Sequence, residues 1–359
     1  MKINLKTKSK RPALLILLPC ALLLFFTHGW RIASAAPKPE LVISTYDSIA
    51  SPTGLGGKLF PLFEKRCGCK VKVTAAGDAG TLASRLELEA KSGRVRSHVV
   101  LGVDELLWPR IEPFAEPFQP NGVRKLLPEI QTGVKSISKG FVPFDHGVFA
   151  FMLDTRSRME PPRTLGDLTS DRFKKRFILE DPRTSTPGLA FLHFTRSVMP
   201  EKWENYWAQL AGHWLTLSPG WDQAYGMFLK EEAPLVWSYT TSQAYHRLHG
   251  DPEVGTAKPR YQAVVFEDAM PVQVEGAAMV RGLSGPTRKL AEKFLEFLIS
   301  EEAQALIPEG NWMLPVRAGI QLPNSAFSNL PRPRQWIHLN SDAESLKDIL
   351  ARWNRAVHR

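Results

Sequence analysis

The chain has 359 residues and a formal net charge of +10, with 46 Lys and Arg residues against 36 Asp and Glu residues. Six of these cations and no acid lie in the first 36 residues, so the remainder carries 40 basic and 36 acidic residues and a net charge of +4. This nearly balanced remainder has no Lys/Arg stripe with interleaved aromatic residues, which excludes the usual nucleic-acid-binding surface. Its length suffices for two lobes, each with its own core.

The first segment has the order of a secretory signal. A basic start from Lys2 to Arg11 precedes an apolar run at 13–26 and a small-residue stretch at 33–36. This order is typical of a signal peptide that is removed on export. The apolar run has 14 residues and contains Pro19, so it is shorter than the roughly 20 residues of a membrane-spanning helix. We therefore predict a signal peptide at residues 1–36 and a periplasmic mature chain.

Three β–α units follow in the first part of the mature chain. We expect strands at 41–46, 71–73 and 98–104, with helices between them. The helix expected at 81–91 carries Leu82, Leu86 and Ala90 at fourfold spacing. Successive β–α units predict a parallel sheet covered by helices, with functional residues at the strand ends.

The second part of the chain continues the α/β pattern. Apolar runs predict strands at 148–152, 177–179 and 235–240, and the run at 269–280 is extended and returns to the first lobe. We expect one amphipathic helix over 291–307, ended by Pro308. A loop is expected at 331–334 and a final surface helix at 343–357.

A first lobe that the chain leaves and later rejoins requires two crossings. We predict that lobe 1 comprises residues 38–144 plus 270–330, lobe 2 residues 145–269, and a C-terminal helical segment residues 331–359. Two crossings between lobes form a hinge, and a hinge allows a cleft to close on a small solute.

Motifs for catalysis or metal binding are missing from the sequence. It contains neither a glycine-rich phosphate loop, nor a Gly-x-Ser-x-Gly elbow, nor a His-Glu-x-x-His motif. His246 and His249 lack a third ligand nearby, and we interpret them as a solvated helix face. Cys67 and Cys69 either form a small disulfide in an oxidising compartment or remain thiols. We predict no enzymatic activity, no metal and no cofactor.

Aromatic residues gather in the second lobe. Five of the ten tryptophans lie between residues 203 and 237. Trp203, Trp207 and Trp214 have helix-like spacing, which predicts that they belong to the core. Trp221 follows a turn and begins a helix, so it stands at the edge of an element where ligands bind. Tyr239 ends a strand just before a short turn, which makes it a second candidate.

Ser185 and Thr186 lie between a strand and a helix that begins near Pro187. Hydroxyl groups and free N–H groups at a helix N-terminus either form an anion site or cap the helix, and the sequence leaves both open.

Several motifs resemble those of one family in order and near its spacing. They are Cys67-Gly68-Cys69 and the stretches 45–48 (TYDS), 181–189 (DPRTSTPGL), 220–229 (GWDQAYGMFL), 238–245 (SYTTSQAY) and 310–315 (GNWMLP). The mature chain resembles the periplasmic thiamine-binding proteins of ABC importers over essentially its whole length. The resemblance implies an α/β fold of the periplasmic-binding-protein type II. This fold has two lobes, each with a central, mostly parallel sheet flanked by helices, joined by a two-crossing hinge.

The resemblance also implies partners. We expect a monomer that captures thiamine, thiamine monophosphate and thiamine diphosphate and delivers them to the membrane permease of an ABC importer. No nucleic-acid partner is expected.

The resemblance implies three kinds of ligand contact. Tyr46 would flank the ligand, and Asp78 would hydrogen-bond its aminopyrimidine. The aromatic walls around thiazolium and pyrimidine would be Trp221, Tyr239, Tyr245 and Trp312. A ligand phosphate would meet Thr184, Ser185 and Thr186. Residues 49–57 depart from the family where an aromatic residue stands, which alters the expected mouth of the cleft.

Two alternatives follow from relatives of the same fold. A binding protein for another solute, such as iron or a polyamine, is one, although ferric-binding relatives use neighbouring tyrosines and this chain has no adjacent Tyr pair. A thiamine-cleaving enzyme is the other, and it would need a cysteine nucleophile in the cleft. Cys67 and Cys69 are predicted at the entry to a strand, away from the cleft.

Overall fold

The computed structural model describes residues 38–249, 259–266, 269–322, 325–339 and 345–358. The predicted signal peptide lies outside the described residues. Residues Lys38–Arg359 form one compact unit. No helix among the described residues has both the length and the apolar character needed to cross a bilayer.

The strands of this unit alternate with helices. In chain order the strands are β1 (Glu40–Thr45), β2 (Lys70–Ala75), β3 (Val99–Asp104), β4 (Val142–Asp154), β5 (Phe177–Glu180), β6 (Thr216–Ser218), β7 (Leu235–Tyr239), β8 (Tyr261–Val264), β9 (Ala269–Met279), β10 (Leu314–Pro315) and β11 (Gln335–His338).

The α-helices are α1 (Asp47–Ala50), α2 (Leu55–Cys67), α3 (Ala79–Lys91), α4 (Trp108–Ile111), α5 (Pro128–Gly133), α6 (Thr186–Val198), α7 (Trp203–Leu210), α8 (Trp221–Leu229), α9 (Ser242–Leu248), α10 (Gly285–Leu298), α11 (Glu301–Gln304), α12 (Ile307–Gly310) and α13 (Leu346–Val357). Short 3₁₀ turns connect several of them, at Glu112–Phe114, Asn121–Lys125, Lys135–Lys139, Thr155–Ser157, Leu165–Thr169, Asp171–Phe173 and Ser325–Phe327.

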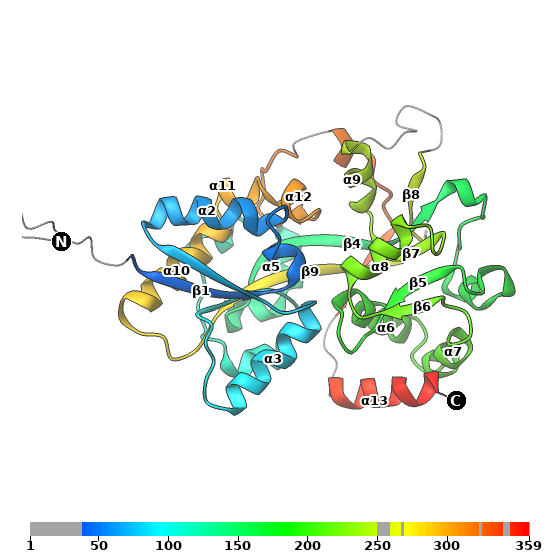
Figure 1. Cartoon of the computed structure of the whole chain (residues 1–359), viewed down its shortest axis with the longest axis horizontal. Helices are drawn as coiled ribbons and strands as arrows, with labels where there is room; N and C mark the ends of the chain where they lie inside the picture. The colour runs from blue at the N-terminus through cyan, green and yellow to red at the C-terminus, as the bar shows by residue number, and fades with distance from the viewer. Residues whose placement is uncertain (1–37, 250–258, 267–268, 323–324, 340–344, 359) are drawn as a thin grey trace, which may run out of the picture. The chain divides into compact units, whose positions relative to one another are not determined.

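The strands pair in the order β2-β1-β3-β9-β4-β7-β5-β6. At one end β1 is parallel to β2 and β3, and at the other end β5 is parallel to β6 and β7. Between them, β9 is antiparallel to β3 and β4, and β4 is antiparallel to β7. The predicted architecture of two mostly parallel sheets flanked by helices is confirmed. Figure 1 shows β4 and β9 running from the part of the unit that contains β1 to the part that contains β7.

Strand β4 links the two sheets because its two ends have different partners. Residues 142–148 pair with β9, whereas residues 149–153 pair with β7. Every residue of β4 is buried, including the polar residues Asp145 and His146. The sequence predicts the strand only at 148–152, where the apolar run is uninterrupted. The strand predicted at 148–152 is therefore real but begins earlier, at Val142. The lobe boundaries at 144/145 and 269/270 fall within β4 and at the start of β9, and they stay a prediction.

The helix predicted over 291–307 is wrong in its extent. The structure has α10, which ends at Leu298, followed by the separate short helices α11 and α12. Ser300 has extended backbone angles, and its hydroxyl accepts a hydrogen bond from the Ala303 N–H at 3.4 Å. An N-cap serine begins a new helix, and this explains why the amphipathic pattern does not continue as one element.

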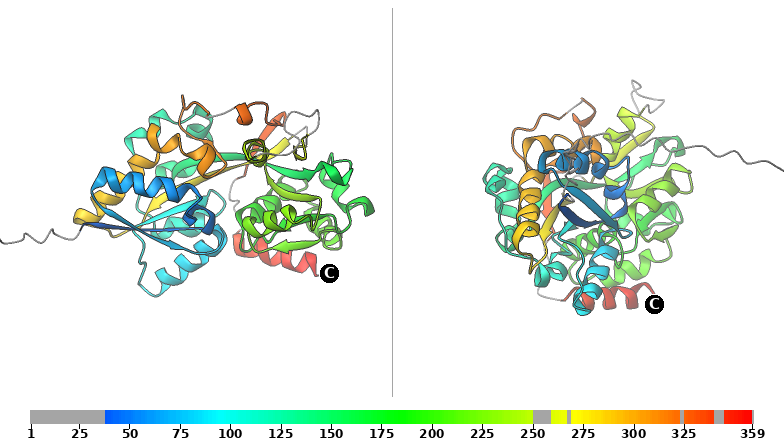
Figure 2. Two further views of the ribbon diagram at one scale, coloured as in Figure 1. Left: turned by 45° about the horizontal axis from the view of Figure 1, so that its top comes forward. Right: turned by 60° about the vertical axis from the view of Figure 1, so that its left-hand side comes forward.

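The final helix, α13, packs against α7, and both views in Figure 2 place it (red) beside green helices. Its Trp353 is buried and lies edge-on to Trp207, with ring centroids 5.7 Å apart. The prediction of a surface helix is therefore right for its outer side only, because Ile349, Trp353 and Ala356 are buried. The prediction that Trp203 and Trp207 belong to the core is confirmed by their burial.

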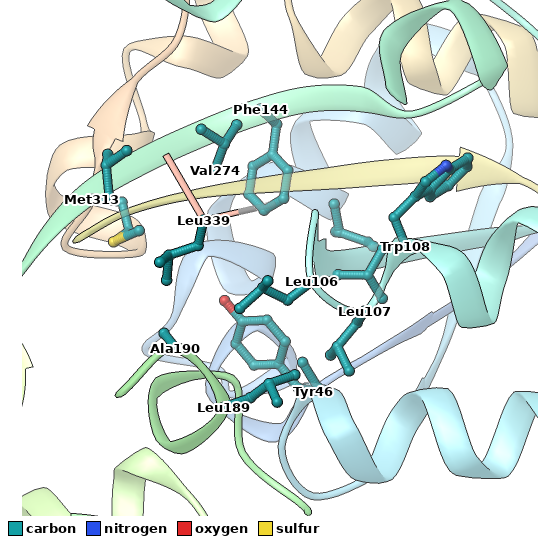
Figure 3. Close-up of a cluster of buried hydrophobic side chains, with 14 of the residues drawn as sticks. Tyr46, Leu106, Leu107, Trp108, Phe144, Leu189, Ala190, Val274, Met313 and Leu339 are labelled. Atoms are coloured by element: carbon teal, nitrogen blue, oxygen red, sulfur yellow. The ribbon is translucent and has the colours of Figure 1, made fainter. Parts of the chain in front are cut away.

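The main core includes residues from both sheets. Figure 3 shows Tyr46 in this cluster together with Leu106 and Leu107, which follow β3, and Leu189 of α6. Tyr46, which follows β1, and Leu189 of α6 thus belong to one apolar cluster. This cluster supports the segment between β1 and α1.

Candidate functional site

A cavity of about 440 Å³ lies where the ends of β1 and β7 approach the first turns of α3, α6 and α8. Strand β9, helices α1 and α9, the turn after α1 and the turn between α12 and β10 also contribute to its lining. A volume of this size is within the range of sites for small organic ligands.

Seven of the nine predicted contact residues line this cavity: Tyr46, Asp78, Thr186, Trp221, Tyr239, Tyr245 and Trp312. Thr184 and Ser185 do not line it. The Thr184 hydroxyl donates to the Pro219 carbonyl at 2.7 Å, and the Ser185 hydroxyl donates to an Asp78 carboxylate oxygen at 2.8 Å. Both residues therefore lie directly behind the cavity wall.

Two pairs of aromatic rings contribute to the lining. Trp221 stacks on Tyr225 with ring centroids 4.8 Å apart, and its indole N–H donates to the Ser238 hydroxyl at 2.8 Å. Tyr245 and Trp312 meet edge to face with centroids 4.9 Å apart. Hydrogen bonds and ring packing hold these faces in fixed orientations, as a preformed binding surface requires.

Trp312 has a backbone φ of +53°. A non-glycine residue in this left-handed region costs on the order of 1–3 kcal/mol, and such residues concentrate at functional sites. The conformation turns the indole toward Tyr245 and also toward Phe327, whose ring lies nearly parallel at 6.4 Å.

Asp78 joins three helix N-termini. Its carboxylate accepts from the Ala79 N–H at 2.7 Å, from the Ser185 hydroxyl at 2.8 Å and from the Trp221 N–H at 3.1 Å. These donors belong to the starts of α3, α6 and α8. Burial raises the pKa of the Asp78 carboxyl, although the three hydrogen bonds oppose that effect.

The cavity lining has a marked charge imbalance. Among the described residues it contains Asp47, Asp78, Asp222 and Glu275 but no lysine, arginine or histidine. Aromatic faces and carboxyl groups without basic partners favour a cationic ligand over an anionic one.

Other lining residues escaped the sequence analysis, among them Tyr225, Gln273, Glu275 and Asn311. Gln273 and Glu275 lie two residues apart in the apolar strand β9, so both face the same side. A pair of polar residues at that spacing inside a buried strand was the available signal. Asn311 sits beside Trp312 in a motif already quoted, and Tyr225 follows Trp221 by one helical turn.

The interpretation of His246 as solvated is wrong. His246 is buried, its Nε2 lies 2.8 Å from the Tyr225 hydroxyl, and its ring stacks on Tyr261 with centroids 3.9 Å apart. The apolar neighbours come from β8 and α8, which sequence spacing on α9 alone does not reveal. In the described part of the chain, no group of three or more His, Cys, Asp or Glu residues is arranged to hold a metal ion.

Cys67 and Cys69 form a disulfide at the end of α2, which resolves the alternative left open by the sequence. Neither cysteine lines the cavity. A cysteine nucleophile of the kind that a thiamine-cleaving enzyme uses is therefore not placed at this site.

Two sheets linked by crossing strands, with an aromatic and acidic cavity between strand ends, define a class of protein that encloses a small solute. The sequence model of the family described as bacterial extracellular solute-binding protein matches residues 110–342. The chain belongs to this family, whose members bind solutes and are not enzymes. The prediction that the chain is not an enzyme is thereby confirmed.

Individual relatives agree with the resemblance predicted from the motifs. The thiamine-binding periplasmic protein of Salmonella typhimurium is 38% identical over 331 residues, which cover 91% of this chain and 96% of the relative. A solved structure described as a periplasmic thiamin binding protein is 36% identical, with a TM-score of 0.79 over 90% of this chain and 97% of the other. The apo ferric ion-binding protein A of Pasteurella haemolytica shares the fold, with a TM-score of 0.66 over 89% of this chain and 96% of its own at 18% identity.

Proposed function

We propose that this chain is a periplasmic binding protein that captures thiamine in the cavity beside Trp221 and Tyr239 and delivers it to the permease of an ABC importer. The observation that carries the proposal is a cavity with aromatic walls and four carboxyl groups but, among the described residues, no basic side chain. The names of two relatives add support, because one is a thiamine-binding periplasmic protein and the other a periplasmic thiamin binding protein.

The chemistry of thiamine matches this lining. Its thiazolium carries a permanent positive charge that no proton loss removes. An aromatic face attracts such a cation by about 0.5–2 kcal/mol, and more where water is excluded. Stacked pairs such as Trp221 with Tyr225 offer several faces, so their sum accounts for a substantial part of a tight affinity.

We extend the proposal to thiamine monophosphate and diphosphate. The donors available to a phosphate are the Ser185 hydroxyl and the Ala79 and Trp221 N–H groups, which now bond to Asp78. Helix N-termini favour anions, so a ligand phosphate would bind at the start of α6, where Thr186 lines the cavity. Thr184 and Thr186 would support this position, and Tyr46 and Tyr245 would flank the rings.

Export and the monomeric state complete the proposal. The signal peptide predicted at residues 1–36 would direct the chain to the periplasm, where the relatives are named as residing. The chain would act as a monomer, as the resemblance implies.

Titration calorimetry on ligand-stripped protein tests the function. We expect heat with thiamine, and we expect Trp221→Ala to weaken its binding at least tenfold because one stacked face is lost. Trp336→Ala is the matched control, since this partly buried indole lies outside the cavity and its removal leaves the affinity unchanged. Absence of heat with thiamine and both phosphates would reject the function.

The same titrations test the phosphate subsite. We expect Ser185→Ala to weaken binding of the two phosphates while binding of thiamine changes little, because of the three ligands only the phosphates would accept a hydrogen bond from this hydroxyl. An equal loss for all three ligands would show that Ser185 acts through its hydrogen bond to Asp78 and not through the phosphate.

A further inference from the structure

Two buried carboxyl groups face each other at the cavity floor. Asp145 of β4 and Glu275 of β9 are register partners in the antiparallel ladder, and both are at least 96% buried, at 0% and 4% exposure. Glu275 lines the cavity, and Asp145 lies behind it. Both carboxyls come from the strands that cross between the two sheets.

The donors around this pair are too few for two charged carboxylates. Asn311 Nδ2 lies 2.7 Å from Asp145 Oδ2 and 3.2 Å from Glu275 Oε2, and the Tyr46 hydroxyl donates to Glu275 Oε2 at 3.0 Å. Asp145 Oδ1 has no hydrogen-bond partner among the described residues, although it is fully buried. Buried polar atoms are nearly always satisfied, and two fully ionised carboxylates would leave at least this oxygen without a donor.

Among the described residues, no positively charged group acts on the pKa of Asp145 or Glu275. The titratable groups that face it are Tyr46 after β1, Asp104 at the end of β3, Asp78 at the start of α3, and Tyr239 of β7. Burial, and then repulsion from Glu275, raises the pKa of Asp145, and burial raises the pKa of Glu275 to about 7. Two negative charges at one buried site repel each other, so the pair retains a proton.

We propose that Asp145 and Glu275 form the charge-recognition element of the cavity, and that capture of a cationic solute releases the proton that this pair shares. Without a ligand, the pair carries a single negative charge. The positive charge of the bound cation stabilises the second carboxylate, so the shared proton is released. The inference rests on the proposed function, because it takes the thiazolium as the cation.

The pH dependence follows from this exchange. The released proton is a product of binding, so a higher pH favours the complex. Affinity for thiamine should rise by up to about tenfold per pH unit while the free pair is still protonated. The rise should level off only at the pH where the free pair loses its last proton, because burial and repulsion from Glu275 raise the pKa of Asp145.

Calorimetry at several pH values in two buffers of different ionisation enthalpy counts the released protons. We expect close to one proton per thiamine at pH 6 and fewer at pH 8.5. A neutral analogue, in which a thiophene replaces the thiazolium and the aminopyrimidine is kept, should release none at either pH. Equal proton counts for thiamine and this analogue would overturn the inference, and the wild-type protein suffices for that comparison.

Glu275→Gln assigns the proton to this pair. The amide keeps the size of the side chain but cannot carry the charge, so we expect no proton release and thiamine affinity that is at least tenfold weaker and independent of pH. Glu105→Gln is the matched control, because burial also raises the pKa of Glu105 to about 7 although it lies outside the cavity. Wild-type proton release by folded Glu275→Gln would overturn the inference.

The outcomes separate the two proposals. Thiamine binding without proton release rejects only the role of the pair. No binding of thiamine at any pH rejects the proposed function itself.

Discussion

At the scale of single residues, the Asp78 side chain makes more hydrogen bonds than that of any other predicted contact residue. It was expected to bind the aminopyrimidine, and the structure also makes it the acceptor for donors from two distant segments. Ser185 and Trp221 are 107 and 143 residues away in sequence. The carboxylate therefore ties α3 to α6 and α8, and a ligand that approaches it meets groups from all three helices.

Asp78→Asn tests this role. The amide has one oxygen, so it cannot accept from Ala79, Ser185 and Trp221 together, and its NH₂ group would face their donors. A hydrogen bond to a charged group contributes about 1.5–3 kcal/mol, and we expect thiamine affinity to fall at least tenfold by calorimetry.

Asp222→Asn provides the comparison. It removes the same charge from the cavity lining, but within the described part of the chain its carboxylate accepts no hydrogen bond. A loss of affinity as large as that of Asp78→Asn would show that the charge, and not the hydrogen bonding, matters.

The residues of the site differ in how far the sequence predicted them. Trp221, Tyr239 and Trp312 stand at the edges of elements within recognisable motifs, and the structure brings them to one cavity. Glu275 was missed because it lies in a largely apolar strand, and a single acid there does not by itself indicate a binding site. Its partner Asp145 was missed because only strand pairing, which links residues 130 positions apart, brings them together.

At the scale of elements, the strands and helices followed the sequence patterns except where a polar residue intervenes locally. Strands β1, β2 and β3 lie close to the positions predicted from the sequence, 41–46, 71–73 and 98–104. The predicted helix at 291–307 broke at Ser300 because a side-chain cap outweighed the amphipathic pattern. The close approach of α3 to the segment before α6 had no sequence signal beyond Gly80, which permits it.

Gly80→Ala tests this approach. A Cβ at position 80 would stand 2.6 Å from the carbonyl carbon and oxygen of Thr184, which is closer than atoms pack. We expect α3 and α6 to be held apart and thiamine affinity to fall at least tenfold in calorimetry. Helix propensity favours alanine by up to about 1 kcal/mol, so loss of helix α3 does not explain such a result.

Gly212→Ala is the matched control, because a Cβ there meets no atom within 4 Å. Wild-type affinity in Gly80→Ala would show that the contact between α3 and Thr184 is not required in the bound state.

At the scale of the whole molecule, the crossing strands β4 and β9 have two tasks. They join the sheet that contains β1 to the sheet that contains β7, and they carry Asp145, Gln273 and Glu275 to the floor of the cavity. A movement of one sheet relative to the other would therefore bend the strands next to the charge-recognition element. The fold class and the family could be predicted from the sequence. That the two crossing strands also carry the buried carboxyl groups became evident only from the pairing of β4 with β9.

A crystal structure of the ligand-stripped protein grown with thiamine tests the central claim most directly. We predict thiamine in the cavity, with its thiazolium ring within about 6 Å of an aromatic centroid of Trp221, Tyr239 or Tyr245. We also predict that Glu275 is the nearest carboxyl group to the positive ring. Thiamine bound elsewhere on the molecule, or an empty cavity at saturating thiamine, would contradict the account.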